Sequence, residues 1–387
     1  MRVLFLISRF FTIGCLFLPC VTAAQGTWER KTDCPISRVK AVAFSIGQYG
    51  YVGTGVGNDS VMNDFWRYDP VNDSWQQVAS MPTLGQWAAF SFVINGIAYV
   101  GSGYNPDASF NFELWSYDPV YDKWGRKENI PWMVYADETL ASFSIGNRGY
   151  LVATHNQNNF REYDPENDTW TNKTNFPTNQ LLGMVSFTIG NKGYVGSGFD
   201  GQINALTERF WEYDPAADTW TRKADFPKPR GYAVGFSVEK CGYIGLGVGR
   251  AEFFNDCWEY RQTTDVWARV ADCGFWALDP MAMTMGSKAY VGPGGNLWEF
   301  APDFSDVQLT PQSYPFSMYP NPTSDLLKIS TDVPAIRSMT IYNSLGQVVM
   351  KGKFDSQTID VSGLTTGVYR IVCYTDGRVL SATFIKE

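Results

Sequence analysis

Short runs of alternating apolar and polar residues recur through most of the chain. Residues 43–46 (Ala-Phe-Ser-Ile) are typical, and the runs are bounded by Gly, Asn, Asp and Pro. Alternation with a period of two predicts β-strands with one buried face, and the bounding residues are typical of turns. No stretch between residues 27 and 302 has a convincing helical period. We therefore expect an all-β protein.

Three patterns return six times in the same order. Tryptophans recur at intervals of 47, 49, 46, 50 and 47 residues, at Trp28, Trp75, Trp124, Trp170, Trp220 and Trp267. The pattern Phe-Trp-Arg-Tyr-Asp-Pro at residues 65–70 returns at 114–119, 160–165 and 210–215, and in weaker form at 257–260 and 297–300. Gly or Ala precedes a strand tyrosine at Tyr51, Tyr99, Tyr150, Tyr194, Tyr243 and Tyr290. A unit of about 50 residues with four short strands is typical of a propeller blade, so we predict a six-bladed β-propeller over residues 25–302.

At these positions the chain resembles the Kelch family, the propeller type of galactose oxidase, over about residues 27–302. The family usually carries paired glycines after the strand tyrosine. This chain has Gly-x-Gly in five units and Val152-Ala153 in the third. The resemblance implies a Kelch-type propeller. It implies little about function, because such propellers include enzymes and binding modules alike.

The repeat also predicts how the ring closes. The strand of Trp28 has no preceding strands, and the sixth unit ends after Trp298 with no tryptophan nine residues later. Placing the Trp28 strand as the outer strand of the sixth blade would remove two open sheet edges at once.

Acidic pairs recur in the turn before each repeated tryptophan. The pairs are Asp69/Asp73, Asp118/Asp122, Asp164/Asp168 and Asp214/Asp218. In isolation such pairs resemble calcium sites. A pair in every unit is what a repeated turn requires, because proline fixes φ and aspartate caps free backbone amides. We expect these acids to be structural.

One face of the propeller is expected to carry the ligand site. The distance from the strand tyrosine to the residue equivalent to Trp66 varies, at 15, 16, 11, 17, 15 and 8 residues. In an antiparallel blade this loop and the connection to the next blade emerge on the same face, and loops on a fixed scaffold carry function. Aromatic platforms with arginine suit a sugar, a peptide or a carboxylate. The candidate ligand-binding residues are Arg38, Trp87, Trp132, Tyr135, His155, Arg230, Tyr232 and Trp276.

Composition narrows the function classes. The net charge of −8 argues against nucleic acid or an anionic membrane surface as the partner. A single histidine, His155, leaves no multi-histidine metal site, so the copper chemistry of galactose oxidase does not carry over. We expect no cofactor and no metal. No G-x-S-x-G elbow, P-loop or Cys–His constellation is present.

The expected function is therefore non-catalytic binding of an extracellular glycan or protein. The alternative is a carbohydrate-modifying enzyme such as a sugar epimerase or mutarotase, which needs only positioned acids and arginines. Glu138, Glu208 and Glu252 lie on or near the variable face, but no diagnostic spacing pairs them. A third possibility is a purely structural surface or matrix component.

The first 24 residues are expected to be a secretory signal peptide. Arg2 and Arg9 precede the apolar run 10–18, and small residues follow at 21–24. A lipoprotein signal is disfavoured because Leu18 and Pro19, not a small residue, precede Cys20. No second apolar stretch approaches membrane length, so we expect no membrane span.

Five cysteines remain after signal removal, at irregular spacing: Cys34, Cys241, Cys257, Cys273 and Cys373. An odd, irregular set argues against a disulfide scaffold or a zinc site, so we expect mostly free or buried thiols. Cys257 shares the register of Phe65 and is expected to be a packed core residue rather than a redox group. A bridge between Cys34 and Cys273, each six residues after a tryptophan, stays open.

The C-terminal segment departs from the repeat. Residues 303–315 are expected to form a linker. Residues 316–387 contain Tyr-Pro-Asn-Pro at 319–322 and alternating strands with Gly and Asn turns, which predict a small β-sandwich. This segment resembles the type A C-terminal sorting domain of the type IX (Por) secretion system of Bacteroidetes. The resemblance implies recognition by that secretion machinery and a secreted or outer-surface protein. An ordinary adhesive β-sandwich is the alternative.

Overall fold

The chain divides into two compact units, residues 1–303 and 304–387. The computed structural model describes residues 26–131, 140–154, 159–277, 279–292, 295–303, 317–330, 336–343, 348–353, 358–375 and 378–387. Every regular element in these ranges is a β-strand, so the all-β prediction is confirmed. None of the described segments is a helix long and apolar enough to cross a membrane.

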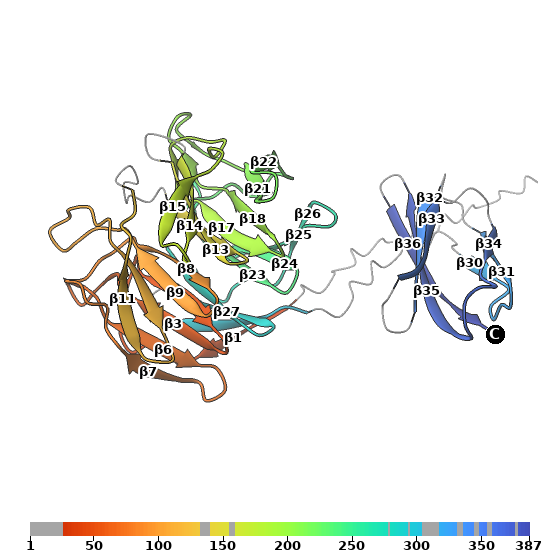
Figure 1. Ribbon diagram of the computed structural model, residues 1–387, viewed down its shortest axis with the longest axis horizontal. Coiled ribbons are helices and arrows are strands. Elements are labelled where there is room, and N and C mark those ends of the chain that lie inside the picture. The colour runs from red at the N-terminus through yellow and green to blue at the C-terminus, as the bar shows by residue number, and fades with distance from the viewer. Residues whose placement is uncertain are drawn as a thin grey trace, which may run out of the picture. The chain divides into compact units, whose positions relative to one another are not determined.

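Within its described residues, the first unit contains six four-stranded antiparallel sheets (Figure 1). Sheet one consists of β2 (Val42–Ile46), β3 (Tyr49–Gly53), β6 (Phe65–Asp69) and β7 (Ser74–Val78). Sheet two consists of β8 (Phe90–Ile94), β9 (Ile97–Gly101), β10 (Leu114–Asp118) and β11 (Lys123–Lys127). Sheet three consists of β12 (Leu140–Ile145), β13 (Arg148–Ala153), β14 (Asn159–Asp164) and β15 (Thr169–Asn172).

The other three sheets follow in chain order. Sheet four consists of β17 (Val185–Ile189), β18 (Lys192–Gly196), β21 (Phe210–Asp214) and β22 (Thr219–Arg222). Sheet five consists of β23 (Val234–Val238), β24 (Cys241–Gly245), β25 (Cys257–Arg261) and β26 (Val266–Arg269). Sheet six consists of β27 (Met281–Met285), β28 (Lys288–Gly292), β29 (Leu297–Ala301) and β1 (Thr27–Lys31). Short strands lie on the loops: β4 (Val56–Gly57), β5 (Ser60–Val61), β16 (Leu181–Leu182), β19 (Phe199–Asp200) and β20 (Ala205–Leu206).

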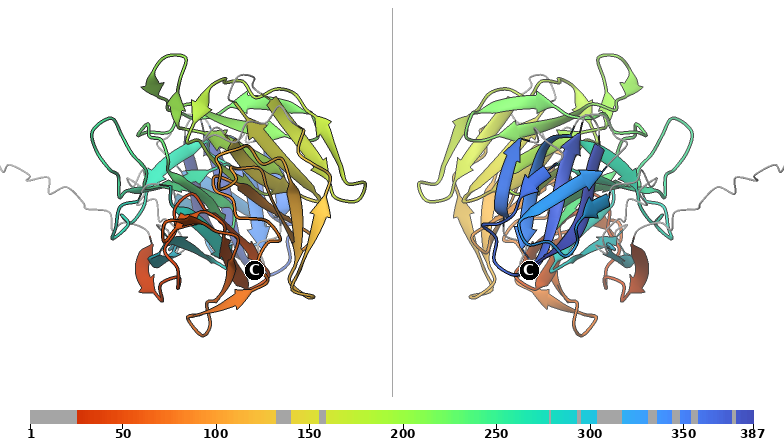
Figure 2. Two further views of the ribbon diagram at one scale, coloured as in Figure 1. Left: turned by 90° about the vertical axis from the view of Figure 1, so that its left-hand side faces the viewer. Right: turned by 90° about the vertical axis from the view of Figure 1, so that its right-hand side faces the viewer.

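The sheets form a closed propeller. The first strands β2, β8, β12, β17, β23 and β27 each contact the next in this order, and β27 contacts β2 again (Figure 2). Strand β1 pairs antiparallel with β29, with Trp28 opposite Phe300. The N-terminal strand therefore supplies the outer strand of the last sheet, and the predicted ring closure is confirmed.

Burial follows position within each sheet. Alternate residues of the first strands are buried, the second strands are almost wholly buried, and the outer strands are mostly exposed. Neighbouring sheets approach so closely that a Cβ on Gly242 would lie 2.0 Å from the Phe187 ring of the preceding sheet. This close approach explains the glycine before Tyr243, because a Cβ there would force sheets four and five apart.

The acidic turns are structural, as predicted. Asp69 accepts hydrogen bonds from the amides of Val71 and Asn72, which caps the turn. Asp73 accepts a 2.6 Å hydrogen bond from the hydroxyl of Tyr68. The described residues contain no cluster of three or more His, Cys, Asp or Glu that could hold a metal ion.

The second unit, taken by itself, contains two packed sheets. One consists of β30 (Ser317–Tyr319), β31 (Leu326–Ser330) and β34 (Thr358–Asp360), and the other of β33 (Val348–Lys353), β32 (Ile336–Asn343), β35 (Gly367–Thr375) and β36 (Arg378–Lys386). Leu327 and Ile359 of the first sheet share one buried cluster with Ile341, Ile371 and Phe384 of the second. This unit is the predicted small β-sandwich.

Candidate functional site

A central cavity of about 320 Å³ is lined by residues of all six sheets in the first unit. Its wall carries serine hydroxyls that link neighbouring first strands. Ser142 donates to the carbonyl of Ser91 at 2.9 Å, and Ser186 donates to the carbonyl of Ser142 at 2.9 Å. These bonds hold the first strands in a fixed register around the cavity.

The residues at the entrance occupy equivalent positions, two before each first strand. We call Lys40, Ala88, Gly183, Tyr232 and Asp279 the mouth ring; all five line the cavity. All five have left-handed backbone conformations, with φ of 53°, 55°, 58°, 53° and 51°. Four of them are not glycine, and such strain is found most often where function requires a fixed side-chain position.

Backbone hydrogen bonds link the mouth ring at two junctions, between sheets one and two and between sheets four and five. The amide of Ala88 donates to the carbonyl of Lys40 at 2.9 Å, and the amide of Tyr232 donates to the carbonyl of Gly183 at 3.0 Å. The entrance presents an ammonium group, a phenol and a carboxylate from equivalent positions. Lys40 and Asp279 were absent from the sequence-derived candidates, although their shared place before the first strands is readable once the strand starts are aligned.

A run of stacked aromatic rings extends outward from Lys40. The ammonium nitrogen of Lys40 lies 5.0 Å from the ring centroid of Trp87. Trp87 stacks on Tyr104 with centroids 4.4 Å apart and planes 17° apart, and Tyr104 packs on Phe110 at 5.0 Å. Trp87 and Tyr104 also form a β-bridge, so the connection between sheets and the loop of sheet two emerge on one face, as the topology predicted.

A second aromatic pair lies on the connection before Asp279 and on a neighbouring loop. Trp276 is 64% exposed and Phe253 is 56% exposed, and their ring centroids lie 4.9 Å apart. Trp276 belongs to the connection that leads to Asp279, and Phe253 to the loop between β24 and β25. Two large apolar side chains that pack on each other yet remain exposed offer a platform for a ligand.

Arg38 and Arg230 do not reach the surface, contrary to the prediction that they contact ligand. Arg38 is 1% exposed and pairs with both carboxylate oxygens of Asp64, at 3.0 and 2.9 Å. Arg230 is 0% exposed and lies 2.6 Å from the carboxylate of Asp256. Burial raises the pKa of Asp64, but the hydrogen bonds and charge of Arg38 outweigh this effect and hold the pKa below its usual value. Both arginines are buried anchors of the loops.

The buried arginines nevertheless hold the chain next to the mouth ring in place. Arg38 also donates to the carbonyl of Thr54 at 3.1 Å, and Arg230 donates to that of Leu246 at 2.8 Å. Each arginine lies two residues before a mouth-ring residue, Lys40 or Tyr232. The ion pairs therefore tie the mouth ring to the loop after the second strand.

Three of the predicted site residues, Trp132, Tyr135 and His155, lie outside the described residues, as does Glu138. Of the predicted residues that are described, Trp87, Tyr232 and Trp276 are at least partly exposed. Tyr232 belongs to the mouth ring. Trp87 directly precedes the mouth-ring residue Ala88, and Trp276 lies on the connection to the mouth-ring residue Asp279.

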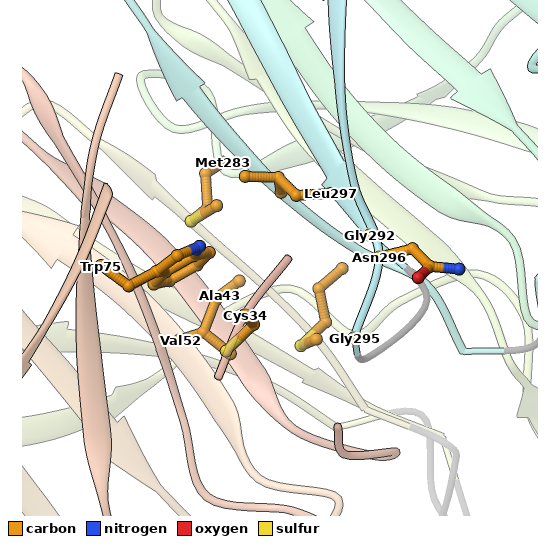
Figure 3. Close-up of a pocket in the computed structure, with 10 residues that line it drawn as sticks. Cys34, Ala43, Val52, Trp75, Met283, Gly292, Gly295, Asn296 and Leu297 are labelled. Carbon is orange, nitrogen blue, oxygen red and sulfur yellow. The ribbon is translucent and has the colours of Figure 1, made fainter. Parts of the chain in front are cut away.

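A much smaller cavity, about 20 Å³, lies between sheets six and one. Figure 3 shows the residues that line it, with Cys34 beside Ala43 and Val52 of sheet one and with Met283 and Leu297 of sheet six opposite. Its volume is that of a single water molecule and its lining is almost wholly apolar, so it is a packing gap rather than a ligand site.

Comparison with known proteins supports this architecture. Residues 50–82 match the Kelch motif, and residues 317–387 match the secretion system C-terminal sorting domain. The solved structure titled "Structure of YjhT" superposes with a TM-score of 0.59 at 13% sequence identity, covering 70% of this chain and 95% of that chain. This similarity concerns the fold alone. No curated protein matches the chain. The first unit of this chain is therefore a Kelch-type β-propeller, and the second is a C-terminal sorting domain of the type IX secretion system.

Proposed function

We propose that the propeller is a non-catalytic module that binds a glycan outside the cell, and that the mouth ring and its flanking aromatic residues form the site. The observation that carries the proposal is the position of Lys40. It lies at the cavity entrance and over the face of Trp87, 5.0 Å from the ring centroid. An aromatic face, a cation and a recess thus occur at one place.

The chemistry of the entrance suits a sugar. The C–H face of a pyranose stacks on an indole ring, as Trp87 and Trp276 would allow, while hydroxyl groups need donors and acceptors such as Tyr232 and Asp279. A cavity of about 320 Å³ lies at the lower end of the range for small-molecule sites, so it would hold one or two sugar units. A flat protein surface would leave the recess empty, which favours a glycan over a protein ligand.

The place of action follows from the second unit. The sorting domain at residues 317–387 indicates export by the type IX secretion system to the cell surface or beyond. We propose that residues 1–24 direct the preceding step across the inner membrane. The proposed ligand is therefore an extracellular glycan, and the partner of the second unit is the secretion machinery.

A glycan array with the propeller, residues 25–302, tests the proposal, followed by titration of each hit. Trp87→Ala should weaken binding by about 5- to 150-fold, since one stacked aromatic contributes about 1–3 kcal/mol by truncation. Tyr121→Ala is the matched control, because Tyr121 is 72% exposed on the turn between β10 and β11, at the opposite face. It should leave affinity unchanged.

Three outcomes would contradict the proposal. Equal affinity of the Trp87→Ala and wild-type proteins for every hit would place the site elsewhere. An NMR time course that shows turnover of a bound sugar would establish the alternative, a carbohydrate-modifying enzyme. Silence on the array together with capture of a defined protein ligand would replace the glycan by a protein.

A further inference from the structure

Five of the six sheets of the propeller contain a buried pair sixteen residues apart. The first member opens the third strand, and the second lies just after the outer strand. Both members belong to one buried cluster in five sheets, and each is at most 2% exposed. The pairs are Phe65/Met81, Leu114/Ile130, Phe160/Phe176, Phe210/Phe226 and Cys257/Cys273.

The two members of a pair approach the same neighbouring residue in sheets two and three. Phe160 and Phe176 both lie 4.9 Å from the ring of Trp220. A Cβ built on Gly101 would approach both Ile130 and Leu114, at 2.9 and 3.0 Å. In sheets one to four, two large side chains therefore fill this space, and in sheet five two cysteines occupy it.

The backbone brings the two cysteines of sheet five together. The amide of Val270 donates to the carbonyl of Cys257 at 2.9 Å, and the amide of Cys273 donates to the carbonyl of Asn255 at 2.7 Å. Residues 270–273 thus run alongside residues 255–257. Burial, followed by a hydrogen bond between the two thiol groups, raises the pKa of Cys273 well above its usual value. In the structure both cysteines are free thiols.

We propose that Cys257 and Cys273 form a structural disulfide in the exported protein. Cysteine replaces both members of a single contact pair, which is the change a bridge requires. The exported environment indicated by the sorting domain is one in which disulfides form and persist. Cys34, the equivalent of Cys273 in the last sheet, has Leu297 and not a cysteine at the partner position, and Cys373 belongs to the second unit.

The bond forms by thiol–disulfide exchange with a thiol oxidoreductase. One cysteine thiolate attacks the disulfide of the oxidoreductase and forms a mixed disulfide, and the other thiolate then displaces the oxidoreductase as a dithiol. Two electrons pass to the oxidoreductase, and the two cysteines lose their thiol protons. Because burial in the folded protein disfavours the thiolate of Cys273 and excludes a protein partner, oxidation precedes closure of this part of the core.

The bridge would stabilise the site region as well as the sheet. It closes a loop that contains β26 and fastens the start of the connection that carries Trp276 and Asp279. Restricting a loop of this length raises stability mainly by reducing the freedom of the unfolded chain. We expect reduction to lower Tm by about 5 °C or more.

Peptide mapping of the full mature chain, folded in an oxidising periplasm, tests the proposal. Trypsin cuts at Arg250, Arg261, Arg269 and Lys288, so the two cysteines fall in separate peptides, 251–261 and 270–288. Without reductant these peptides should appear joined, and three of the five thiols should titrate in denaturant. The double variant Cys257→Val/Cys273→Val should lose the response of Tm to reductant, whereas Cys241→Ser should keep it.

If the double variant fails to fold, peptide mapping and thiol titration of the wild-type chain still decide the question. Five titratable thiols with both peptides unlinked would overturn the proposal. A bridge from Cys273 to Cys34 would also overturn the proposal. It would establish the bridge between neighbouring sheets of the propeller that the sequence left open.

Discussion

The backbone amide of Thr32 donates a 2.9 Å hydrogen bond to the carboxylate of Asp73. Thr32 follows the closing strand β1 of sheet six, and Asp73 lies in the outer turn of sheet one. The indole nitrogen of Trp75 completes the junction by donating to the carbonyl of Thr32 at 2.9 Å. Two side chains of sheet one therefore hydrogen-bond to the backbone of one residue, Thr32, and so close the ring.

The same two hydrogen bonds recur at three of the five internal junctions. Asp122, Asp218 and Asp265 accept hydrogen bonds from the amides of Ala79, Thr174 and Ala224, and the following tryptophans donate to the same residues' carbonyls. At the junction between sheets five and six, Trp28 donates to the carbonyl of Ala271 at 2.9 Å. There Gly26 occupies the aspartate position and Phe300 the tyrosine position, so that junction uses the tryptophan alone.

Deletion of residues 25–35 should therefore open the ring. It removes β1, exposes the edge of β29 and leaves Asp73 and Trp75 without their backbone partner. We expect the melting temperature of the propeller to fall by more than about 10 °C, since several backbone hydrogen bonds and the burial of Trp28 are lost together. Differential scanning calorimetry measures the effect.

The matched truncation removes residues 316–387 and should leave the melting transition of the propeller nearly unchanged, because this segment belongs to the separate second unit. Equal melting of the two truncated proteins would show that closure through β1 contributes little.

Asp218→Ala should destabilise the propeller by about 1–3 kcal/mol, the usual cost of leaving hydrogen-bonding groups without a partner. The hydroxyl of Tyr213 and the amide of Thr174 would both lose their acceptor. Urea unfolding measures the change. Asp214→Ala is the control, because Asp214 caps the same turn and pairs with Lys192 of its own sheet, so its loss should not weaken the junction between sheets. Equal losses in the two variants would mean that capping of the turn, and not the hydrogen bond between sheets, explains the role of Asp218.

Stability should depend on pH through the same pair. Burial raises the pKa of Asp218, but hydrogen bonds from Tyr213 and Thr174 outweigh it and lower the pKa below its usual value. Its contribution is therefore present above the unfolded-state pKa of about 4 and is lost as the pH falls below that. Burial and the hydrogen bond to Asp218 raise the pKa of Tyr213 far above its usual value, so this contribution is lost above about pH 10.

Urea titrations from pH 2 to 11 should thus show a plateau with losses at both ends. Asp218→Asn should reduce both slopes, because it removes the titrating carboxylate and the charge near Tyr213. An acid slope identical to that of the wild-type protein would assign acid sensitivity to other carboxylates.

The repeat made the ring, its closure and the acidic turns predictable, since each depends on residues that recur at a fixed spacing. The buried arginines were misassigned because a lone arginine in a connection resembles a surface residue. The missed signal was a partner: Asp64 lies 26 residues after Arg38, and Asp256 lies 26 residues after Arg230. Lys40 and Asp279 were missed for another reason. Their role follows from a left-handed backbone that no residue preference of lysine or aspartate predicts.

The buried ion pair should behave as an anchor and not as a ligand contact. Arg230→Leu leaves the buried Asp256 with Lys228, 3.5 Å away, as its remaining cation, which should cost up to about 3–5 kcal/mol in urea unfolding. The double variant Arg230→Leu/Asp256→Leu should recover much of this loss, because no unpaired charge remains. If the two substitutions simply add, the pair is not coupled and the arginine acts through other contacts.

Filling the gap between sheets six and one should stabilise the closed ring. Cys34 lines this cavity of about 20 Å³, and the equivalent position in sheets one to four holds Met81, Ile130, Phe176 or Phe226. Cys34→Met adds apolar volume of the right size, and cavity filling typically contributes about 0.5–2 kcal/mol. Cys241→Met, outside the cavity, is the control. Destabilisation by Cys34→Met would show that the surrounding side chains cannot accommodate the added atoms.

The second unit should act in export and contribute nothing to ligand binding. Its match to the sorting domain lies wholly within residues 317–387, and it forms its own buried core around Ile341, Ile371 and Phe384. An inert reporter fused between a signal peptide and residues 303–387 should therefore reach the surface of a bacterium with a type IX secretion system and remain periplasmic when that system is absent. A matched fusion with Ile371→Asp should stay periplasmic in both, because a buried charge unfolds the sandwich. The propeller alone should bind glycans as tightly as the full mature chain. A reporter that stays periplasmic in the competent host would contradict the sorting role and favour an adhesive β-sandwich.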